Sequence, residues 1–176
     1  MKNVVTQHND NSRTGAYLSE TQLTPANVNP TTFGKLYERD VEGDVYAQPL
    51  YMRGVPTSLG AKNLFFIATS TNDVYAFDAD NFDANPGAGV IWHRSLDSWR
   101  ALGEDEICTE TIGSVGITST PVIDVQSQTM YVVTRRSTTR GDLHDGENFL
   151  HALNIADGNE RPHSPVKIQA TDPNQQ

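Results

Sequence analysis

Two acidic segments carry the residue types that metal binding or acid–base chemistry would need. The first, residues 142–147, holds four potential metal ligands: Asp142, His144, Asp145 and Glu147. Carboxylates with one imidazole suit Ca²⁺ or another divalent metal, although the spacing matches neither an EF-hand nor a zinc motif. A solvated hairpin loop explains the same residues, so the segment is a candidate metal site with a structural alternative.

The second segment places Glu104, Asp105 and Glu106 close to Cys108 and Glu110. Paired carboxylates can act as a general acid and base, and long loops often carry function. Glu104, Asp105 and Glu106 are therefore the candidate catalytic residues. Their alternative is a hydrated loop, because the chain contains no nucleophile elbow, phosphate loop or dinucleotide fingerprint to support them.

Charge and hydropathy exclude two classes of partner. The net charge is −9 and no basic stripe is present, so nucleic acid is not an expected partner. No apolar run approaches the roughly 20 residues of a membrane span. The single Cys108 cannot form an internal disulfide, and the first residues are too short and polar for a signal peptide.

Two repeats of four short strands organise the chain. The strands expected in the first repeat are 45–50, 65–69, 73–78 and 89–94; those in the second are 117–123, 130–134, 149–154 and 166–169. Four short antiparallel strands per repeat are typical of a propeller blade, and no segment keeps a helical period. The sequence therefore predicts an all-β fold of antiparallel four-stranded propeller blades, an incomplete propeller of about two blades plus one N-terminal strand.

The expected boundaries follow from these repeats, within a single partial propeller domain over 1–176. They are an N-terminal connector over 1–32, a lone strand over 33–41, blade one over 45–96, a long loop over 97–114 and blade two over 115–170.

Several motifs resemble the PQQ-repeat, or quinoprotein alcohol dehydrogenase-like, β-propeller family. Residues 76–80 (Ala-Phe-Asp-Ala-Asp) with Trp92 are similar to its tryptophan-docking motif, and residues 152–158 are a degraded copy. Residues 8–15 and 23–28 are similar to its N-terminal signature. Full members of the wider superfamily have eight blades, so the resemblance implies that this chain is an N-terminal portion of a larger protein.

The resemblance implies structural roles for four of these residues. Trp92, on an outer strand, would stack over the neighbouring blade. Asp78 would accept hydrogen bonds from the next two backbone N–H groups and close a turn. Asp10 and Arg13 belong to the opening signature, which is expected to hold the N-terminal segment in place.

The innermost strands of such propellers face a central channel. Gln48, Thr118 and Thr120 lie beside the prolines of these strands, and Thr118 and Thr120 share one face because side chains alternate. They are candidate ligand-binding residues for a small polar ligand. Hydrogen bonding to backbone groups and water at a crowded axis is the alternative.

The resemblance also bears on cofactor and location. Family enzymes hold PQQ with Ca²⁺, a carboxylate base and often a vicinal cysteine pair, in a channel lined by all the blades. One cysteine and about two blades do not meet these needs, so no cofactor is expected and PQQ is not expected to bind. Location in the periplasm or outside the cell follows from the resemblance alone.

The expected function is a propeller-type scaffold or binding module, a fragment of a larger extracytoplasmic quinoprotein-like protein. Its expected partners are a second copy or another chain that completes the propeller, and a polysaccharide or small polar ligand. The alternative is a truncated enzyme, a hydrolase or an oxidoreductase, that uses the acidic loop residues or a loop-bound metal. A gene fragment without a separate function is a third interpretation.

Overall fold

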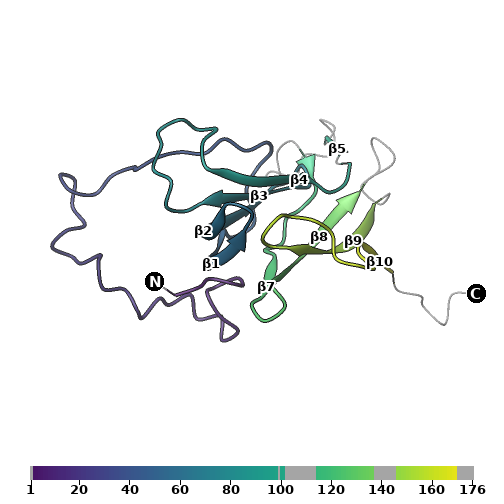
Figure 1. Ribbon diagram of the computed structural model, residues 1–176, viewed down its shortest axis with the longest axis horizontal. Coiled ribbons are helices and arrows are strands. Elements are labelled where there is room, and N and C mark those ends of the chain that lie inside the picture. The colour runs from purple at the N-terminus through teal and green to yellow at the C-terminus, as the bar shows by residue number, and fades with distance from the viewer. Residues whose placement is uncertain (1, 99, 102–113, 137–145, 170–176) are drawn as a thin grey trace, which may run out of the picture.

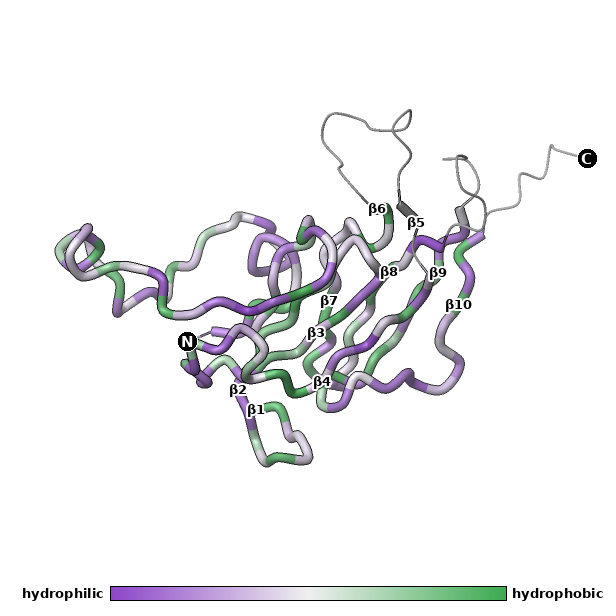
Figure 2. Tube along the Cα trace, turned by 90° about the horizontal axis from the view of Figure 1, so that it is seen from above, coloured by the Kyte–Doolittle hydropathy of each residue, from purple (hydrophilic) through white to green (hydrophobic). Residues whose placement is uncertain are grey.

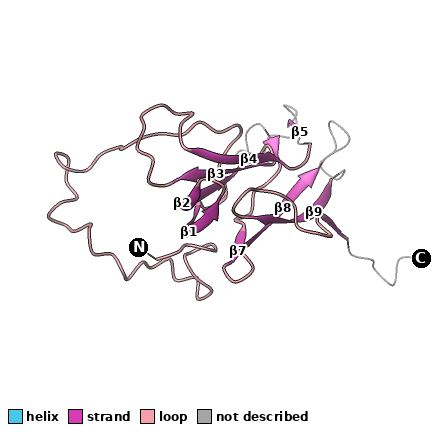
Figure 3. Ribbon diagram, in the orientation of Figure 1, coloured by secondary structure: helices cyan, strands magenta, loops and turns pink. Residues whose placement is uncertain are grey.

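The computed structural model describes residues 2–98, 100–101, 114–136 and 146–169. These residues contain strands and no helix, and hence no helix that is long and apolar enough to cross a membrane (Figure 3). The strands are β1 Leu50–Thr57, β2 Gly60–Ala68, β3 Asp73–Asp78, β4 Val90–Ser95, β5 Arg100–Ala101, β6 Ser114–Val115, β7 Val122–Asp124, β8 Thr129–Arg136, β9 Glu147–Asn154 and β10 Val166–Ile168. The all-β prediction is confirmed.

The chain forms two four-stranded antiparallel sheets that pack against each other (Figure 1). The first sheet has the order β1-β2-β3-β4 and the second the order β7-β8-β9-β10, so each is a simple meander. A two-stranded pair, β5 and β6, stands at the two ends of the predicted loop over 97–114. Neither four-stranded sheet closes on itself.

The β2–β3 hairpin shows why these residues form strands. Both strands are rich in β-branched and aromatic residues, which favour a pleated, half-buried surface. The chain reverses at Thr71 and Asn72, and Asn72 has a left-handed φ of 61°, which asparagine tolerates better than most residues. The Asn72 N–H donates to the Thr69 carbonyl, and the Thr69 N–H donates to the Asp73 carbonyl, which closes the turn.

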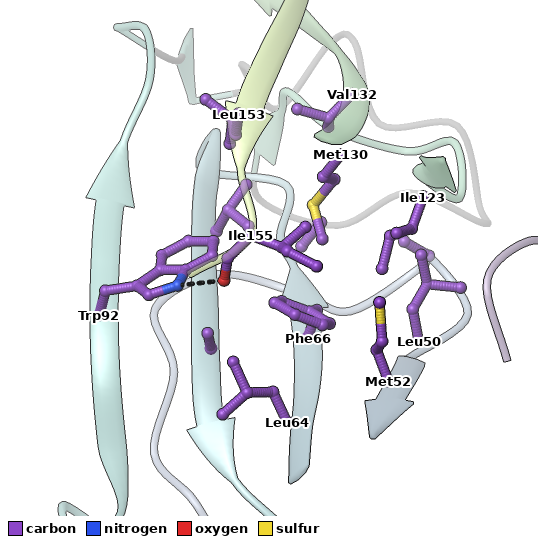
Figure 4. Close-up of a cluster of buried hydrophobic side chains, with 14 of the residues drawn as sticks. Leu50, Met52, Leu64, Phe66, Trp92, Ile123, Met130, Val132, Leu153 and Ile155 are labelled. Carbon is purple, nitrogen blue, oxygen red and sulfur yellow. Dashed lines mark hydrogen bonds between the residues drawn. The ribbon is translucent and has the colours of Figure 1, made fainter. Parts of the chain in front are cut away.

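Alternation gives each sheet two distinct faces, here called front and back. On the first sheet the front face carries Leu50, Phe66, Ala68, Val74, Ala76 and Trp92. On the second sheet the back face carries Ile123, Met130, Val132, His151 and Leu153. The front of the first sheet packs on the back of the second, and the apolar members of both faces belong to one buried core (Figure 4).

The N-terminal segment joins the two sheets at their first strands, β1 and β7. Val4 and Tyr51 of β1 exchange two backbone hydrogen bonds of 2.8 Å, and the Val5 carbonyl accepts from the N–H of Ile123 in β7 at 2.8 Å. Residues 4 and 5 therefore tie β1 to β7.

The predicted lone strand over 33–41 is wrong, because these residues form no strand. They belong to a long loop that projects away from the sheets in both views (Figures 1 and 2), and Leu36 is 77% exposed. A strand needs a partner for its backbone groups, and none of the described strands pairs with this segment. Arg39 instead anchors it, donating to the carbonyls of Asn81 at 2.7 Å and Asp83 at 3.0 Å.

The two proline-marked strands begin later than predicted. Strand β1 begins at Leu50 rather than at residue 45, and β7 begins at Val122 rather than at residue 117. Pro49 and Pro121 stand directly before these strands, because proline lacks the N–H that a ladder requires. The expected repeats over 45–96 and 115–170 therefore contain sheets that span 50–95 and 122–168.

Candidate functional site

The contact between the two sheets is organised by the indole of Trp92. This side chain leaves β4 of the first sheet and is 5% exposed. Its Nε1 donates to the backbone carbonyl of Ile155, which directly follows β9 of the second sheet, at 2.9 Å (Figure 4). The six-membered ring lies against Gly158, where a Cβ would stand 2.6 Å from Cε3 of the indole. Trp92 therefore contacts both a carbonyl and a glycine of the turn that follows β9.

Arg94 extends this contact along the same strand. Its guanidinium donates to the Asp157 carbonyl at 2.8 Å and to Oδ1 of Asn159 at 2.9 Å. The turn that receives both side chains directly follows β9 and overlaps residues 152–158, the segment predicted to be a second copy of the motif. This segment contains no tryptophan, and it forms part of the surface that Trp92 contacts.

Asp78 closes the turn after β3, with one difference from the prediction. Its Oδ1 accepts from the N–H of Asp80 at 3.0 Å, as expected. The N–H of Ala79 donates instead to the Asn63 carbonyl, because β2 lies alongside at that point. Burial raises the pKa of Asp78, but the hydrogen bond from Lys62 and that from the Asp80 N–H outweigh it, so the pKa lies below its ordinary value.

A buried cluster around His151 went unnoticed in the sequence. Its Nδ1 lies 2.6 Å from Oε1 of Glu160, and its Nε2 lies 3.1 Å from Oδ2 of Asp97 and 2.9 Å from Oγ1 of Thr134. The Thr134 hydroxyl also donates to Asp97 at 2.6 Å. The imidazole thus bridges the second sheet and the segment that follows β4.

This cluster has the connectivity of a carboxylate, a base and a hydroxyl nucleophile, but its burial argues against nucleophilic catalysis. Thr134 is 0% exposed and His151 is 1% exposed, so no substrate reaches the hydroxyl. Asp97 of the cluster lines an open depression together with Ser95, Ser98 and Arg136. The cluster therefore joins the second sheet to the segment after β4 by polar contacts.

A second histidine–carboxylate pair stands at the β2–β3 turn. Nε2 of His93 lies 2.8 Å from Oδ1 of Asp73, and the Thr71 hydroxyl donates to Oδ2 of Asp73 at 2.7 Å. The His93 ring stacks on Tyr75 with centroids 4.2 Å apart. Asp73 is buried but the imidazole is largely exposed, so this pair also belongs to the structure of the turn.

The candidate ligand-binding residues lie just before β1 and β7, and two of them, Gln48 and Thr120, hydrogen-bond to backbone groups. Oε1 of Gln48 accepts from the His8 N–H at 2.9 Å, and Oγ1 of Thr120 accepts from the Gln48 N–H at 2.9 Å. Thr118 is exposed. Gln48 and Thr120 therefore connect the N-terminal segment, β1 and β7, as the structural alternative expects.

The opening signature folds into a tight local loop. Oδ1 of Asp10 accepts from the Ser12 N–H at 2.9 Å, the Asp10 carbonyl accepts from the Arg13 N–H at 2.9 Å, and Arg13 donates to Oε1 of Gln7 at 3.1 Å. Asp10 and Arg13 thus shape the segment that ties β1 to β7.

Most of the candidate chemical residues lie outside the described residues: Glu104, Asp105, Glu106, Asp142, His144 and Asp145. Glu147 is the exception, and it lies in β9 between Lys167 at 2.5 Å and Arg136 at 2.7 Å. The Lys167 hydrogen bond and then the Arg136 hydrogen bond hold its pKa below the ordinary value. In the part of the chain that the structure describes, no group of three or more ligating side chains is arranged to hold a metal.

The fold and the site define an all-β protein made of two stacked four-stranded antiparallel meanders. Comparisons of the chain with protein-family models, with curated proteins and with solved structures each found no match.

Proposed function

We propose that this chain is a propeller-type scaffold or binding module, built from stacked blades and working without bound PQQ. The observation that supports it best is the contact of Trp92. Its indole extends from β4, the last strand of the first sheet, and donates a hydrogen bond to the Ile155 carbonyl directly after β9 of the second sheet. The resemblance to the PQQ-repeat propellers implies this docking between blades. The equal meander order of the two sheets gives further support.

A binding role is favoured over catalysis at the His151 cluster, because Thr134 and His151 are buried. The cluster of His151, Thr134 and Asp97 joins the second sheet to the segment after β4, and its hydroxyl, that of Thr134, is buried. We propose that partners instead meet the sheet faces and the inner strands, where a small polar ligand or a polysaccharide would approach Thr118. A periplasmic or extracellular location, a divalent metal in the loop over 142–147 and the alternative enzyme remain predictions from the sequence.

Hydrogen exchange of the Trp92 indole tests the stacked-blade architecture directly. In NMR spectra of the whole chain, recorded at low protein concentration, the indole N–H of Trp92 should exchange as slowly as the backbone amides of β3. Urea unfolding should show one transition, because the two sheets share one core. Rapid exchange of this indole, or separate unfolding of the two sheets, would argue against stacked blades.

A titration tests the claim about the cofactor. Calorimetry of the chain with PQQ and Ca²⁺ together should give no heat beyond dilution, and Ca²⁺ alone serves as the control. A saturable signal that requires PQQ would instead favour the oxidoreductase alternative.

A further inference from the structure

We propose that the front face of the second sheet is a docking surface for a second copy of this chain, joined face to face about a twofold axis. This inference deepens the proposed scaffold role and rests on its stacking of sheets. The surface consists of apolar side chains from all four strands: Val122, Tyr131, Val133, Leu150, Ala152, Val166 and Ile168.

The registers show that this face is equivalent to a buried one. In the first sheet one row of the front face is Leu50, Phe66 and Ala76; in the second sheet the matching row is Val122, Tyr131 and Ala152. The next row is Ala68, Val74 and Arg94 in the first sheet, and Val133, Leu150 and Val166 in the second. The two front faces therefore match position by position.

The same positions differ sharply in exposure. Phe66 and Val74 are 2% and 0% exposed, because the second sheet covers them, whereas Tyr131 and Leu150 are 40% and 37% exposed. Strand β8 nevertheless keeps apolar side chains on both faces, with Met130 and Val132 inside and Tyr131 and Val133 outside. Such a run is typical of a strand covered on both faces.

A second copy meets this face best through its own front face. The back face of the first sheet is already occupied within the chain, since Phe77 is fully buried and the Tyr75 hydroxyl accepts from the Glu42 N–H at 3.2 Å. A head-to-tail stack onto that face is therefore disfavoured. The front face of the second sheet is apolar at its centre and hence self-complementary, as a twofold contact requires.

The charges at the two ends of the front face of the second sheet favour one alignment of the two copies. Asp124 lies at one end of the front face and Arg135 at the other. When the strands of the two copies run in opposite directions, the Asp124 end of each copy faces the Arg135 end of its partner. Sheets that pack in this way lie about 10 Å apart and about 30° from parallel.

The area of the docking face sets the expected affinity of the dimer. Four strands spaced about 4.8 Å apart and about five residues long cover roughly 300 Å². Stable interfaces bury about 800 Å² of accessible surface on each partner. We therefore expect a weak dimer that forms and dissociates within the micromolar to sub-millimolar range.

Sedimentation velocity of the whole chain over this range is the test, with three variants. Leu150→Lys and Val122→Lys place a charge on the docking face and should leave a monomer at every concentration. Val90→Lys is the matched control, because Val90 also lies on a strand and is 43% exposed, against 44% for Val122. It should dimerise as the unmodified chain does.

The proposal would be overturned by a monomer throughout, by a dimer that survives both docking-face substitutions, or by equal loss of the dimer in Val90→Lys. Growth beyond a dimer would exclude the twofold arrangement. Circular dichroism of each variant confirms folding, and Val122→Lys at the sheet edge decides the question if Leu150→Lys fails to fold. The exchange test of Trp92 uses the monomer, so its outcome is independent of this one.

Discussion

Phe66 in β2 and Tyr131 in β8 occupy equivalent positions in the two sheets, yet the first is 2% exposed and the second 40%. Both strands alternate in the same way, and both side chains are aromatic. The difference comes from outside the strands, because the second sheet covers the front of the first and no described element covers the front of the second. Whether a sheet face is buried thus depends on whether another sheet packs on it, and not only on the residues of the strand itself.

The two histidine–carboxylate pairs repeat this comparison on a smaller scale. His93 pairs with Asp73 near the surface of the first sheet, with a side chain 43% exposed. His151 pairs with Asp97 and Glu160 inside the molecule, with a side chain 1% exposed. Only the second pair lies where two sheets meet, so we expect it to contribute more to stability.

The largest expected effect is at Trp92. Trp92→Ala should lower the free energy of unfolding by about 3–5 kcal/mol, the cost typical of truncating a buried tryptophan. Tyr131→Ala, on the exposed front face, should cost less than about 1 kcal/mol at a concentration where the chain is monomeric. Urea unfolding followed by circular dichroism measures both. Equal losses would show that the two front faces do not differ as described.

The next largest effect on the free energy of unfolding is expected at His151, the buried histidine. His151→Phe leaves Asp97 and Glu160 without their shared partner, and we expect a loss of about 2–4 kcal/mol. His93→Phe is the matched substitution in the first sheet and should cost less than His151→Phe, because it removes the partner of one carboxylate rather than of two. A larger loss of unfolding free energy in His93→Phe than in His151→Phe would contradict the expectation that the buried pair contributes more to stability.

A glycine comparison isolates the contact beneath the indole. Gly158 and Gly54 both have left-handed φ values, 70° and 63°, so alanine at either position should cost about 1–2 kcal/mol in backbone strain. Only at Gly158 would the new methyl group meet Trp92, and overpacking should add about 1–3 kcal/mol. If the added cost arises from the indole, it should disappear when Gly158→Ala is combined with Trp92→Ala.

The smallest effect concerns acid stability. Asp78 and Glu147 have lowered pKa values in the folded chain, so each adds stability above the ordinary carboxyl pKa and loses it as the pH falls toward the folded value. Between neutral pH and about pH 3, Asp78→Asn should therefore flatten the decline of the unfolding free energy. Glu147→Gln should flatten it less, since solvent screens that group. A steeper decline in either variant would contradict the sign of the shift.

Particular residues show how far sequence reasoning reaches. The β2–β3 hairpin followed from alternation and the Thr71–Asn72 turn, whereas the partners of Trp92, the Ile155 carbonyl and Gly158, were not predicted. The strand starts at Leu50 and Val122 were misplaced by a few residues, although the missing N–H of the preceding proline was a usable signal. The mistaken strand over 33–41 had suitable residues but no partner, and a partner is a property of the whole fold.

The sequence by itself determined the local elements of this protein: the meanders, their turns and which side chains share a face. These depend on neighbours within a few residues, through alternation, β propensity and turn chemistry. The tertiary structure alone decided which faces are buried, and it gathered Asp97, Thr134, His151 and Glu160 into one cluster. Those outcomes depend on contacts between residues tens of positions apart, which no local pattern encodes.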